Sequence, residues 1–502
     1  MSYKIYSKTQ TNLCYNGYKI KINGKEVEAD TARVSAVPFN RRWPGYQRSI
    51  DQTELVNFLL LETDESLHFE ITPPEKSDNV IIRPVSLGIN PVVTDDGTIV
   101  FTLPKNAYFT VEPYGRKNGL HIFADPVSEH NVDVSHTELI YFGKGEHNAG
   151  TIVLKSNQTL FIDEGAVVYA CVHAVDAKNI RIIGKGILDN SKNIEQITYF
   201  ENTCGNTKAV HNAIRQHTIK LEYCTDIEIK GITIRDSLVY NIRLIACKDV
   251  NISAVKLIGN WRYNSDGIDM HNCENVSIDN CFIRTFDDCI CVKGFDFFYT
   301  ENPMLAYQKA MSHGGNCYDS FKNISVKNCV LWNDWGRCLE IGAETQAKEI
   351  CDVRFENCSV IHVSMQVLDC QNVDFAFVHD VFYRNIDIEY DDVIPECIYQ
   401  QSDDMVYKDA DPDYTPAVIE VCVICHPEYS GNCAIRGKNR DIHFENIRLF
   451  GRQKPIIHIE SYDDEFSSEN VYIKDFYHNG KKLDKKDFEL QIDKYSKNVI
   501  IE

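Results

Sequence analysis

Three aspartates in the middle of the chain have the residue type and spacing for acid–base chemistry. They are Asp266, Asp287 and Asp288, and Asp288 follows Asp266 by 22 residues. If the segments around them stack in a parallel sheet, whose strands lie about 4.8 Å apart, Asp266 and Asp288 occupy adjacent positions with Asp287 beside them. Like charges held this close raise the pKa of at least one carboxyl group. One cluster can then supply both a general acid and a general base.

A repeat in the sequence supplies elements that would place these aspartates together. Each copy starts with Asn or Asp, continues with a β-branched residue, and then alternates apolar with other residues. The nine copies begin at Asn179, Asp226, Asp249, Asn275, Asn323, Asp352, Asp380, Asp441 and Asn470. The alternation, broken at Asn and Gly, predicts short strands rather than helices. One copy is then one coil of a solenoid, which predicts an all-β, single-stranded parallel β-helix.

The spacing of the copies indicates how many coils there are. Between Asp226 and Asp380 the copies lie 23 to 29 residues apart, except for 48 residues between Asn275 and Asn323. We interpret that longer gap as two coils. Stacking the coils on their apolar positions aligns Asp266 with Asp288 and then with Arg337 of a later coil.

The chain divides into two predicted domains. Residues 1–135 lack the repeat, and their strand-like segments are separated by Pro and Asp-Gly turn signals, which predicts an N-terminal antiparallel β-sandwich. Residues 136–502 form the predicted β-helix, which is the catalytic domain. Residues 390–416 are polar, acidic and out of register, as expected of an insertion loop on one coil.

Composition narrows the possible partners and surroundings. The formal net charge is −21, so there is no electrostatic footprint for nucleic acid or an anionic membrane. The sequence has no signal peptide and no long apolar run. Many of the 19 cysteines lie in apolar strand-like segments, which indicates reduced, buried residues. We therefore expect a cytoplasmic location, although secretion stays open if a signal has been trimmed.

Two motifs carry a family resemblance. Asn264-Ser-Asp-Gly-Ile-Asp269 and Asp287-Asp-Cys-Ile-Cys-Val-Lys293 resemble the paired signature of glycoside hydrolase family 28, the polygalacturonases, and of the related family 49, the dextranases. The resemblance covers about residues 140 to 480 and implies a right-handed parallel β-helix. An N-terminal sandwich is similar to the family 49 arrangement. By this resemblance Asp287 is the general acid, Asp266 and Asp288 hold and deprotonate the attacking water, and the reaction proceeds with inversion.

The consecutive positions of Asp287 and Asp288 set a geometric condition. A regular strand would point neighbouring side chains to opposite faces, so a bend or bulge must bring both to one groove. Inverting enzymes also hold acid and base roughly 6.5–9.5 Å apart to leave room for water. One rung is shorter than that, so Asp287 must splay away from the other two.

Two departures from the family pattern concern the substrate. Arg337, in Gly336-Arg-Cys-Leu-Glu-Ile-Gly342, stands where polygalacturonases have a histidine. The Arg-Ile-Lys motif that binds a galacturonate carboxylate is absent, and the expected region reads Val367-Leu-Asp-Cys-Gln-Asn372. A neutral sugar is therefore favoured over a uronate. Arg337 itself either binds a substrate carboxylate or keeps an aspartate charged, and we favour the second role.

Other side chains are candidates for binding the sugar. The predicted substrate-binding residues are Asn264, Lys293, Arg337, Glu340, Glu344 and Trp335. Four of them have a structural alternative: Lys293 as a solvated charge, which we favour, Glu340 and Glu344 in polar turns, and Trp335 in core packing. The loop around Trp43 either reaches the groove or forms an inter-domain contact. Cys422, Cys425 and His426 lack a second pair of zinc ligands, so we predict no metal and no cofactor.

The sequence thus predicts an inverting glycoside hydrolase acting on an α-linked, neutral glycan or oligosaccharide, with carbohydrate as its partner and neither nucleic acid nor membrane. A polygalacturonase acting on pectin fragments is the alternative within the same class. Two alternatives belong to other classes. One is a non-catalytic carbohydrate-binding β-helix whose Asp column is only a turn ladder, and the other is a polysaccharide lyase or epimerase. The oligomeric state stays open.

Overall fold

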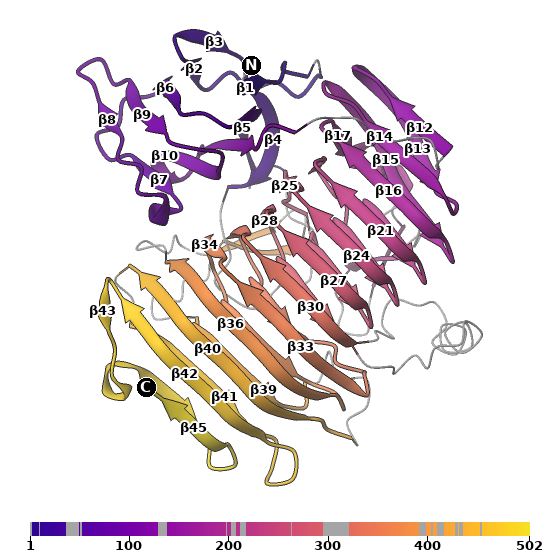
Figure 1. The fold of residues 1–502 in the computed structure, drawn as a ribbon, viewed down its shortest axis with the longest axis vertical. Coiled ribbons are helices and arrows are strands. Elements are labelled where there is room, and N and C mark those ends of the chain that lie inside the picture. Colours follow the sequence, from indigo (N-terminus) through magenta and orange to yellow (C-terminus); the bar gives the residue numbers. More distant parts are fainter. Residues whose placement is uncertain are drawn as a thin grey trace.

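The computed structural model describes residues 3–9, 11–36, 50, 53–128, 138–196, 198–201, 207–210, 217–262, 264–294, 321–390, 398–402, 405–408, 416–426, 430, 435–451 and 454–502. The chain forms a right-handed parallel β-helix that carries an N-terminal domain of antiparallel sheets on one side (Figure 1). Within the described residues, no helix is long and apolar enough to cross a membrane.

Three ladders of parallel strands build the β-helix. The first ladder contains β12 (Glu138–Phe142), β14 (Gln158–Ile162), β16 (Lys178–Gly184), β21 (Thr225–Lys230), β24 (Lys248–Ser253), β27 (Glu274–Asp279), β30 (Phe321–Lys327), β33 (Glu349–Glu356), β36 (Phe377–Glu389), β40 (Lys438–Phe450), β42 (Ser468–His478) and β45 (Lys497–Ile501). The second contains β13 (Gly145–Val153), β15 (Ala166–Val175), β17 (Ile187–Asp189), β22 (Thr233–Arg235), β25 (Lys256–Ile258), β28 (Phe282–Thr285), β31 (Val330–Asn333) and β34 (Ser359–His362). The third contains β20 (Ile219–Glu222), β23 (Ile242–Ile245), β26 (Ile268–His271), β29 (Ile290–Lys293), β32 (Leu339–Ile341), β35 (Leu368–Asn372), β39 (Ile419–Val423), β41 (Ile456–Glu460) and β44 (Glu489–Ile492).

The nine predicted repeat copies are successive rungs of the first ladder. The apolar residue of each copy pairs with that of the next, in the order Ile180, Ile227, Val250, Val276, Ile324, Val353, Val381, Ile442 and Val471. Our interpretation of the 48-residue gap as two coils is wrong. Because Val276 pairs directly with Ile324, the gap is one coil whose extra length includes residues 295–320, outside the described residues.

Backbone geometry explains why each copy begins with Asn or Asp. The first residue of every copy has a positive φ of 53° to 57°, a conformation that Asn and Asp tolerate better than other side chains with a Cβ. The amides also form a ladder across coils. Asn323 Nδ2 donates to Asn275 Oδ1 at 2.8 Å, and Asn275 Nδ2 donates to Asp249 Oδ1 at 2.8 Å. Asp and Asn at these positions therefore have a structural role.

The inside of the coils forms one continuous apolar core. Alternate residues of the three ladders point inward, among them Ile227, Leu244, Ile268 and Val292. The described cysteines are free, and most of them are buried, several within this core. A strand buried on its inner face at every coil needs the period-two pattern of apolar residues that the sequence shows.

The N-terminal domain is a sandwich of two sheets. One sheet has the order β1 (Tyr3–Ile5), β5 (Thr53–Thr63), β11 (Leu120–Asp125), β10 (Tyr108–Arg116) and β7 (Ile81–Arg83), with β4 (Asp30–Ser35) paired to β5; the other has the order β3 (Lys25–Val27), β2 (Lys19–Ile22), β6 (Leu67–Thr72), β9 (Ile99–Leu103) and β8 (Val92–Val93). All pairs are antiparallel except β5 with β11, which is parallel. Apolar side chains of both sheets form one core between them. The predicted boundary near residue 135 falls outside the described residues.

The predicted insertion at residues 390–416 lies between β36 and β39. Its described part includes the strands β37 (Ile398–Ser402) and β38 (Met405–Lys408), which pair in antiparallel fashion. Two strands therefore occur where the sequence predicted only a loop. The remaining short elements are β18 (Thr198–Glu201), β19 (Thr207–Val210), β43 (Lys481–Lys482), η2 (Val85–Leu87), η3 (Ser191–Gln196) and η4 (Lys485–Asp487).

The sandwich packs on the second ladder of the β-helix. Phe58 and Phe123 of its six-stranded sheet join Phe282 and Trp332 of the β-helix in one apolar cluster. Buried ion pairs accompany this packing. Asp125 Oδ2 of β11 lies 2.6 Å from Lys256 Nζ and 2.9 Å from Lys185 Nζ, both of which belong to the β-helix. The two domains are thus joined by apolar contacts and by buried charges.

Replacing Lys256 by Met tests the weight of these buried charges. Lys256 is 1 % exposed, and its loss leaves the buried Asp125 with only Lys185 of its two lysines, so we expect a loss of about 3 kcal/mol in the free energy of unfolding. Lys248→Met is the matched control. Lys248 is 57 % exposed, and its partner Glu274 likewise keeps a second lysine, so the loss should stay below about 1 kcal/mol. Equal urea denaturation midpoints for the two variants would contradict this.

Candidate active site

The three aspartates lie in the connections that join the second ladder to the third. Asp266 lies between β25 and β26, and Asp287 and Asp288 lie between β28 and β29. Neither of the two consecutive aspartates is in a regular strand. The Asp288 N–H donates to Asp287 Oδ1 at 3.0 Å, so the backbone turns around the Asp287 side chain. This connection supplies the bend that the sequence analysis required.

The predicted alignment of Asp266, Asp288 and Arg337 is confirmed by the strand register. Ile268, Ile290 and Leu339 each lie two residues after the aligned residue of their coil. Ile268 pairs with Ile290, and Ile290 pairs with Leu339. The connections are also hydrogen-bonded to each other. The Gly267 N–H donates to Asp288 O at 2.8 Å, and the Cys289 N–H donates to Arg337 O at 2.8 Å.

Two glycines allow these connections to approach so closely. A Cβ on Gly267 would lie 2.2 Å from Cys289 O. Gly336 has a φ of +96°, and a Cβ there would lie 2.7 Å from both Asp288 N and Asp288 Oδ1. Both positions therefore need glycine, and Gly336 needs it for its backbone conformation as well.

Lys293 is buried at the centre of the carboxyl groups. Its Nζ lies 3.1 Å from Asp269 Oδ1, 3.4 Å from Asp266 Oδ2, 3.7 Å from Glu344 Oε2 and 3.9 Å from Asp288 Oδ2. One oxygen each of Asp266 and Asp288 lies within 4.8 Å of the other. The alternative of a solvated Lys293 is wrong, because only 4 % of the residue is exposed. Its outward strand position carries it into the cluster.

Burial and mutual repulsion raise the pKa values of these acids. Burial is the largest cause for Asp266, whose pKa is raised well above its usual range, with the charges of Asp269 and Asp287 next. Burial also raises the pKa of Asp287, with Asp288 as the next cause. The pKa of Asp269 is raised to about 6 by burial, against the opposing effect of Lys293. Burial disfavours the charged form of Lys293, but Asp269 and Glu344 outweigh it and raise the pKa of Lys293.

Comparisons with known proteins place this cluster in a family. The family model of glycosyl hydrolases family 28 matches residues 134–402, more than half of the chain and all three aspartates. The chain belongs to glycosyl hydrolases family 28. A polygalacturonase from Gossypium barbadense is 26 % identical over 228 residues, or 44 % of this chain and 53 % of that protein. An Arabidopsis thaliana exopolygalacturonase is 26 % identical over 36 % of this chain and 46 % of its own length. The chain spans about half the length of the curated relatives it matches.

A solved structure extends the likeness to the N-terminal domain. Dex49A from Penicillium minioluteum superposes with a TM-score of 0.56 and 14 % identity, covering 99 % of this chain and 97 % of its own. The likeness therefore concerns the fold, and it includes the sandwich that lies outside the family 28 match.

A column of polar side chains continues from the cluster along the third ladder. The strand register aligns Asp269, Cys291, Glu340, Asp369, Glu420 and His458 on successive coils. Asp369 and Glu420 were missed as site residues by the sequence analysis. The signal was present, since extending the apolar alternation through Leu368-Asp369-Cys370 and Ile419-Glu420-Val421 places both in the column.

Arg337 pairs with acids of this column. Its guanidinium contacts Asp369 through Nε, lies 3.5 Å from Glu340 Oε1 through Nη1, and is 3.5 Å from Gln371 Oε1. Its backbone N–H donates to Asp288 Oδ1 at 2.7 Å. Burial, opposed by Arg337, raises the pKa values of Glu340 and Asp369. Arg337, which stands where family 28 polygalacturonases have a histidine, is thus already paired with two carboxyl groups of this chain.

The remaining predicted substrate ligands occupy different settings. Glu344 belongs to the Lys293 cluster. Asn264 lies in the connection before Asp266 with a φ of 52°. Trp335 is buried against Phe286, with ring centroids 6.1 Å apart, which is the packing alternative. Residues 39–48, with Trp43, lie outside the described residues. Binding of sugar by these side chains stays a prediction.

Two groups near the column have the donor types and spacing of metal ligands. One is Asp266, Asp288 and Cys291, and the other is Glu420, Cys422 and His458. In the first group the ammonium of Lys293 already contacts both carboxyl groups. In the second group Glu420 accepts from His458 Nδ1 at 2.8 Å. Each group is therefore held together by protein contacts of its own.

The raised pKa of Asp269 predicts a pH-dependent stability. Folded Asp269 binds its proton up to about pH 6, whereas the unfolded residue releases it near 3.8, so rising pH costs the folded state stability between these values. Asp269→Asn removes this linkage. Relative to the wild type, its free energy of unfolding should rise by up to about 3 kcal/mol between pH 4 and 6 and then stay level. Urea denaturation at several pH values measures the difference, and a constant difference would contradict it.

Proposed function

We propose that the chain hydrolyses a glycosidic bond with inversion, with Asp287 as general acid and Asp266 and Asp288 as the groups that activate water. The observation that carries the proposal is the position of Lys293. Its ammonium contacts Asp266 and Asp288, and among the described residues no ion pair joins Asp287 to a cation. The positive charge of Lys293 thus lies against the two proposed bases rather than against the proposed acid.

The raised pKa values of Asp287 and Asp266 fit acid–base catalysis near neutral pH. Burial raises the pKa of Asp287, so this carboxyl group can hold a proton near neutral pH and give it to the leaving oxygen. The pKa of Asp266 is raised as well, which makes its ionised form a stronger base toward water. Acid and base are then different parts of one cluster, as an inverting displacement requires.

A neutral substrate is supported by the ion pairs that the cations near the site form with carboxyl groups of the chain itself. Lys293 contacts four carboxyl groups, and Arg337 contacts Glu340 and Asp369. A uronate carboxylate entering here would add charge to a region where acids outnumber these two cations. We therefore propose an α-linked neutral glycan or oligosaccharide. Polygalacturonate is the second candidate, because the curated relatives are polygalacturonases.

Asp287→Asn tests the acid. The amide has the same shape but gives up no proton, so we expect turnover to fall by roughly 10²- to 10⁴-fold with an unchanged circular dichroism spectrum. Asp249→Asn is the matched control. Asp249 accepts from Asn275 in the amide ladder, where asparagine serves equally well at other coils, so activity should be unchanged. Full activity of Asp287→Asn on every glycan that the wild type cleaves would overturn the role.

A substrate screen with the product anomer followed by NMR tests substrate and stereochemistry together. The panel is dextran, polygalacturonate, and plant and microbial glycans. We expect cleavage of a neutral α-glycan and a β-anomer as the first product. Faster cleavage of polygalacturonate than of any neutral glycan would contradict the proposal of a neutral substrate. An α-anomer as the first product would contradict the inverting mechanism. An unsaturated product formed with calcium would indicate a lyase, and binding without cleavage would indicate a non-catalytic protein.

A further inference from the structure

The backbone of the proposed acid is held by a hydrogen-bond network that begins in the N-terminal domain. The carbonyl oxygen of Asp287 accepts from Thr285 Oγ1 and, at 2.7 Å, from Asn333 Nδ2. The same Nδ2 donates to Trp335 O at 2.8 Å, and Asn333 Oδ1 accepts from Ser364 Oγ at 3.3 Å. Asn333 is fully buried. Its amide therefore fixes where the Asp287 backbone lies.

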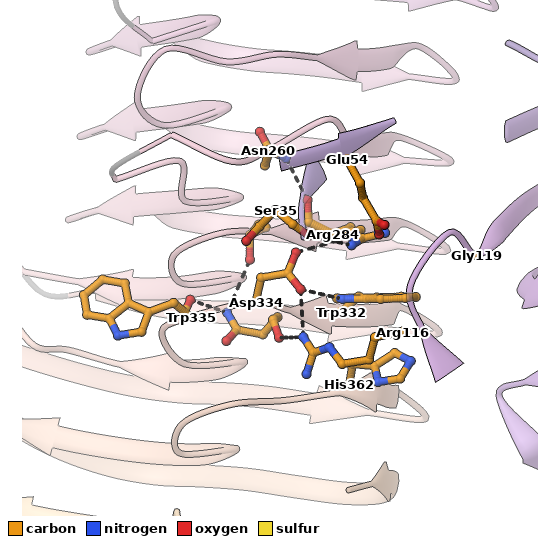
Figure 2. Close-up of polar contacts among 12 residues, drawn as sticks. Ser35, Glu54, Arg116, Gly119, Asn260, Arg284, Trp332, Asp334, Trp335 and His362 are labelled. Carbon is orange, nitrogen blue, oxygen red and sulfur yellow. Dashed lines mark hydrogen bonds and ion pairs between the residues drawn. The ribbon is translucent and has the colours of Figure 1, made fainter. Parts of the chain in front are cut away.

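Arg116 of the sandwich holds Asn333 from the other side. Its Nη2 donates to Asn333 O at 3.0 Å. The same nitrogen donates to Asp334 Oδ1 at 2.7 Å (Figure 2). Arg116 is the last residue of β10, and Asn333 is the last residue of β31. One guanidinium nitrogen thus connects the end of β10 to the segment that contacts the acid.

Asp334 is the fixed point of this network. Figure 2 shows it between Trp332, Arg284 and Arg116. Trp332 Nε1 donates to Asp334 Oδ1 at 2.9 Å, and Arg284 Nε lies 3.4 Å from Asp334 Oδ2. Burial acts against the ionised carboxylate, but Arg284 and Arg116 outweigh it and lower the pKa of Asp334. A charged, buried carboxylate with several donors has little freedom to move.

A second route joins the sandwich to the same connection. Arg284 lies on β28, three residues before Asp287, and its guanidinium lies 3.9 Å from the centroid of the Trp332 ring. Its Nη1 is 3.1 Å from Nε2 of His121, a residue of β11 in the sandwich. Both strands that flank the acid, β28 before it and β31 on the next coil, therefore contact the N-terminal domain.

We propose that Arg116 is a positioning residue for Asp287, and that the N-terminal domain is in this way part of the catalytic apparatus. The inference rests on the proposed role of Asp287 as general acid. Arg116 lies on the side of the β-helix that faces the sandwich, where it contacts Asn333 and Asp334. It acts through Asn333, whose amide sets the distance between the Asp287 carboxyl group and the bond to be broken.

Arg116→Gln removes the charge and the contact with Asn333 O and Asp334. With the glycan that the wild type hydrolyses fastest in the panel above, we expect kcat to fall about 10- to 100-fold and KM to change less than about twofold. With the 2,4-dinitrophenyl glycoside of the same sugar, whose leaving group needs little protonation, the loss should be several-fold smaller. The basic limb of the kcat–pH profile, which reports deprotonation of the acid, should also shift.

Two further variants separate positioning from general damage at the domain interface. Arg116→Lys keeps the charge and should recover part of kcat. Arg83→Gln is the matched control, because Arg83 is also a sandwich arginine that pairs across the interface, but with Glu389 and, within its own domain, Glu112. Arg83→Gln should lower the thermal midpoint as much as Arg116→Gln while leaving the ratio of the two substrates and the pH profile unchanged.

A measurement without substrate keeps the inference distinct from the proposed function. Hydrogen–deuterium exchange in the peptide around residues 284–290 should become faster in Arg116→Gln and stay at the wild-type rate in Arg83→Gln. Equal exchange, or the same loss on both substrates for the two variants, would overturn positioning by Arg116. If exchange responds to Arg116→Gln but Asp287→Asn remains active, the positioning stands and the acid assignment fails.

Discussion

In-register stacking of short parallel strands is the constraint on which the rest of this structure depends. Each coil must place its strand about 4.8 Å from the previous one, so any outward position becomes a column of neighbouring side chains. Inside the coils this produces a continuous apolar core. On the third ladder the same geometry brings Asp269, Glu340 and Asp369 into one column, and in the connections that lead to it Asp266 lies beside Asp288. Crowding of acids is therefore a direct result of the fold, and the positive charges of Lys293 and Arg337 offset part of the repulsion between the acids.

Much of this arrangement could be predicted from the sequence because it depends on local periodicity. The repeat copies, the stacking of Asp266 on Asp288 and Arg337, and the parallel β-helix all follow from apolar alternation. The coil count did not follow, because a 48-residue gap has the length of two coils, and only the pairing of Val276 with Ile324 shows that it is one. The bend at Asp287 was required by geometry, but the close approach of Gly336, on a neighbouring coil, to Asp288 could not be predicted.

The settings and partners that escaped prediction depend on contacts distant in sequence. Lys293 at a strand end has the pattern of a solvated charge, and its burial depends on acids supplied by other coils. Arg116 and Asn333 are separated by 217 residues, and no spacing in either segment indicates that they meet. Periodicity predicts neighbours along a ladder, whereas contacts between a sandwich and a β-helix depend on how two finished surfaces fit. Residues of the first kind could be proposed from the sequence, and those of the second kind needed the structure.

The buried charges at the domain interface and in the site follow the same physical rule but serve different ends. At the interface Asp125 has two lysines and Asp334 has two arginines, so each carboxylate has ample positive charge around it. In the site the ratio is reversed, since one lysine contacts four carboxyl groups. At Asp334 the two arginines outweigh burial and lower the pKa, which fixes the side chain, whereas in the site burial together with the neighbouring carboxyl groups raises the pKa values of Asp266 and Asp287. The charge-matched interface is connected to the acid-rich site through Asn333. Repulsion from the neighbouring carboxylates would turn a mobile Asp287 side chain away from them. The proposed acid therefore needs a fixed backbone, and Asn333 holds that backbone from the side of the sandwich.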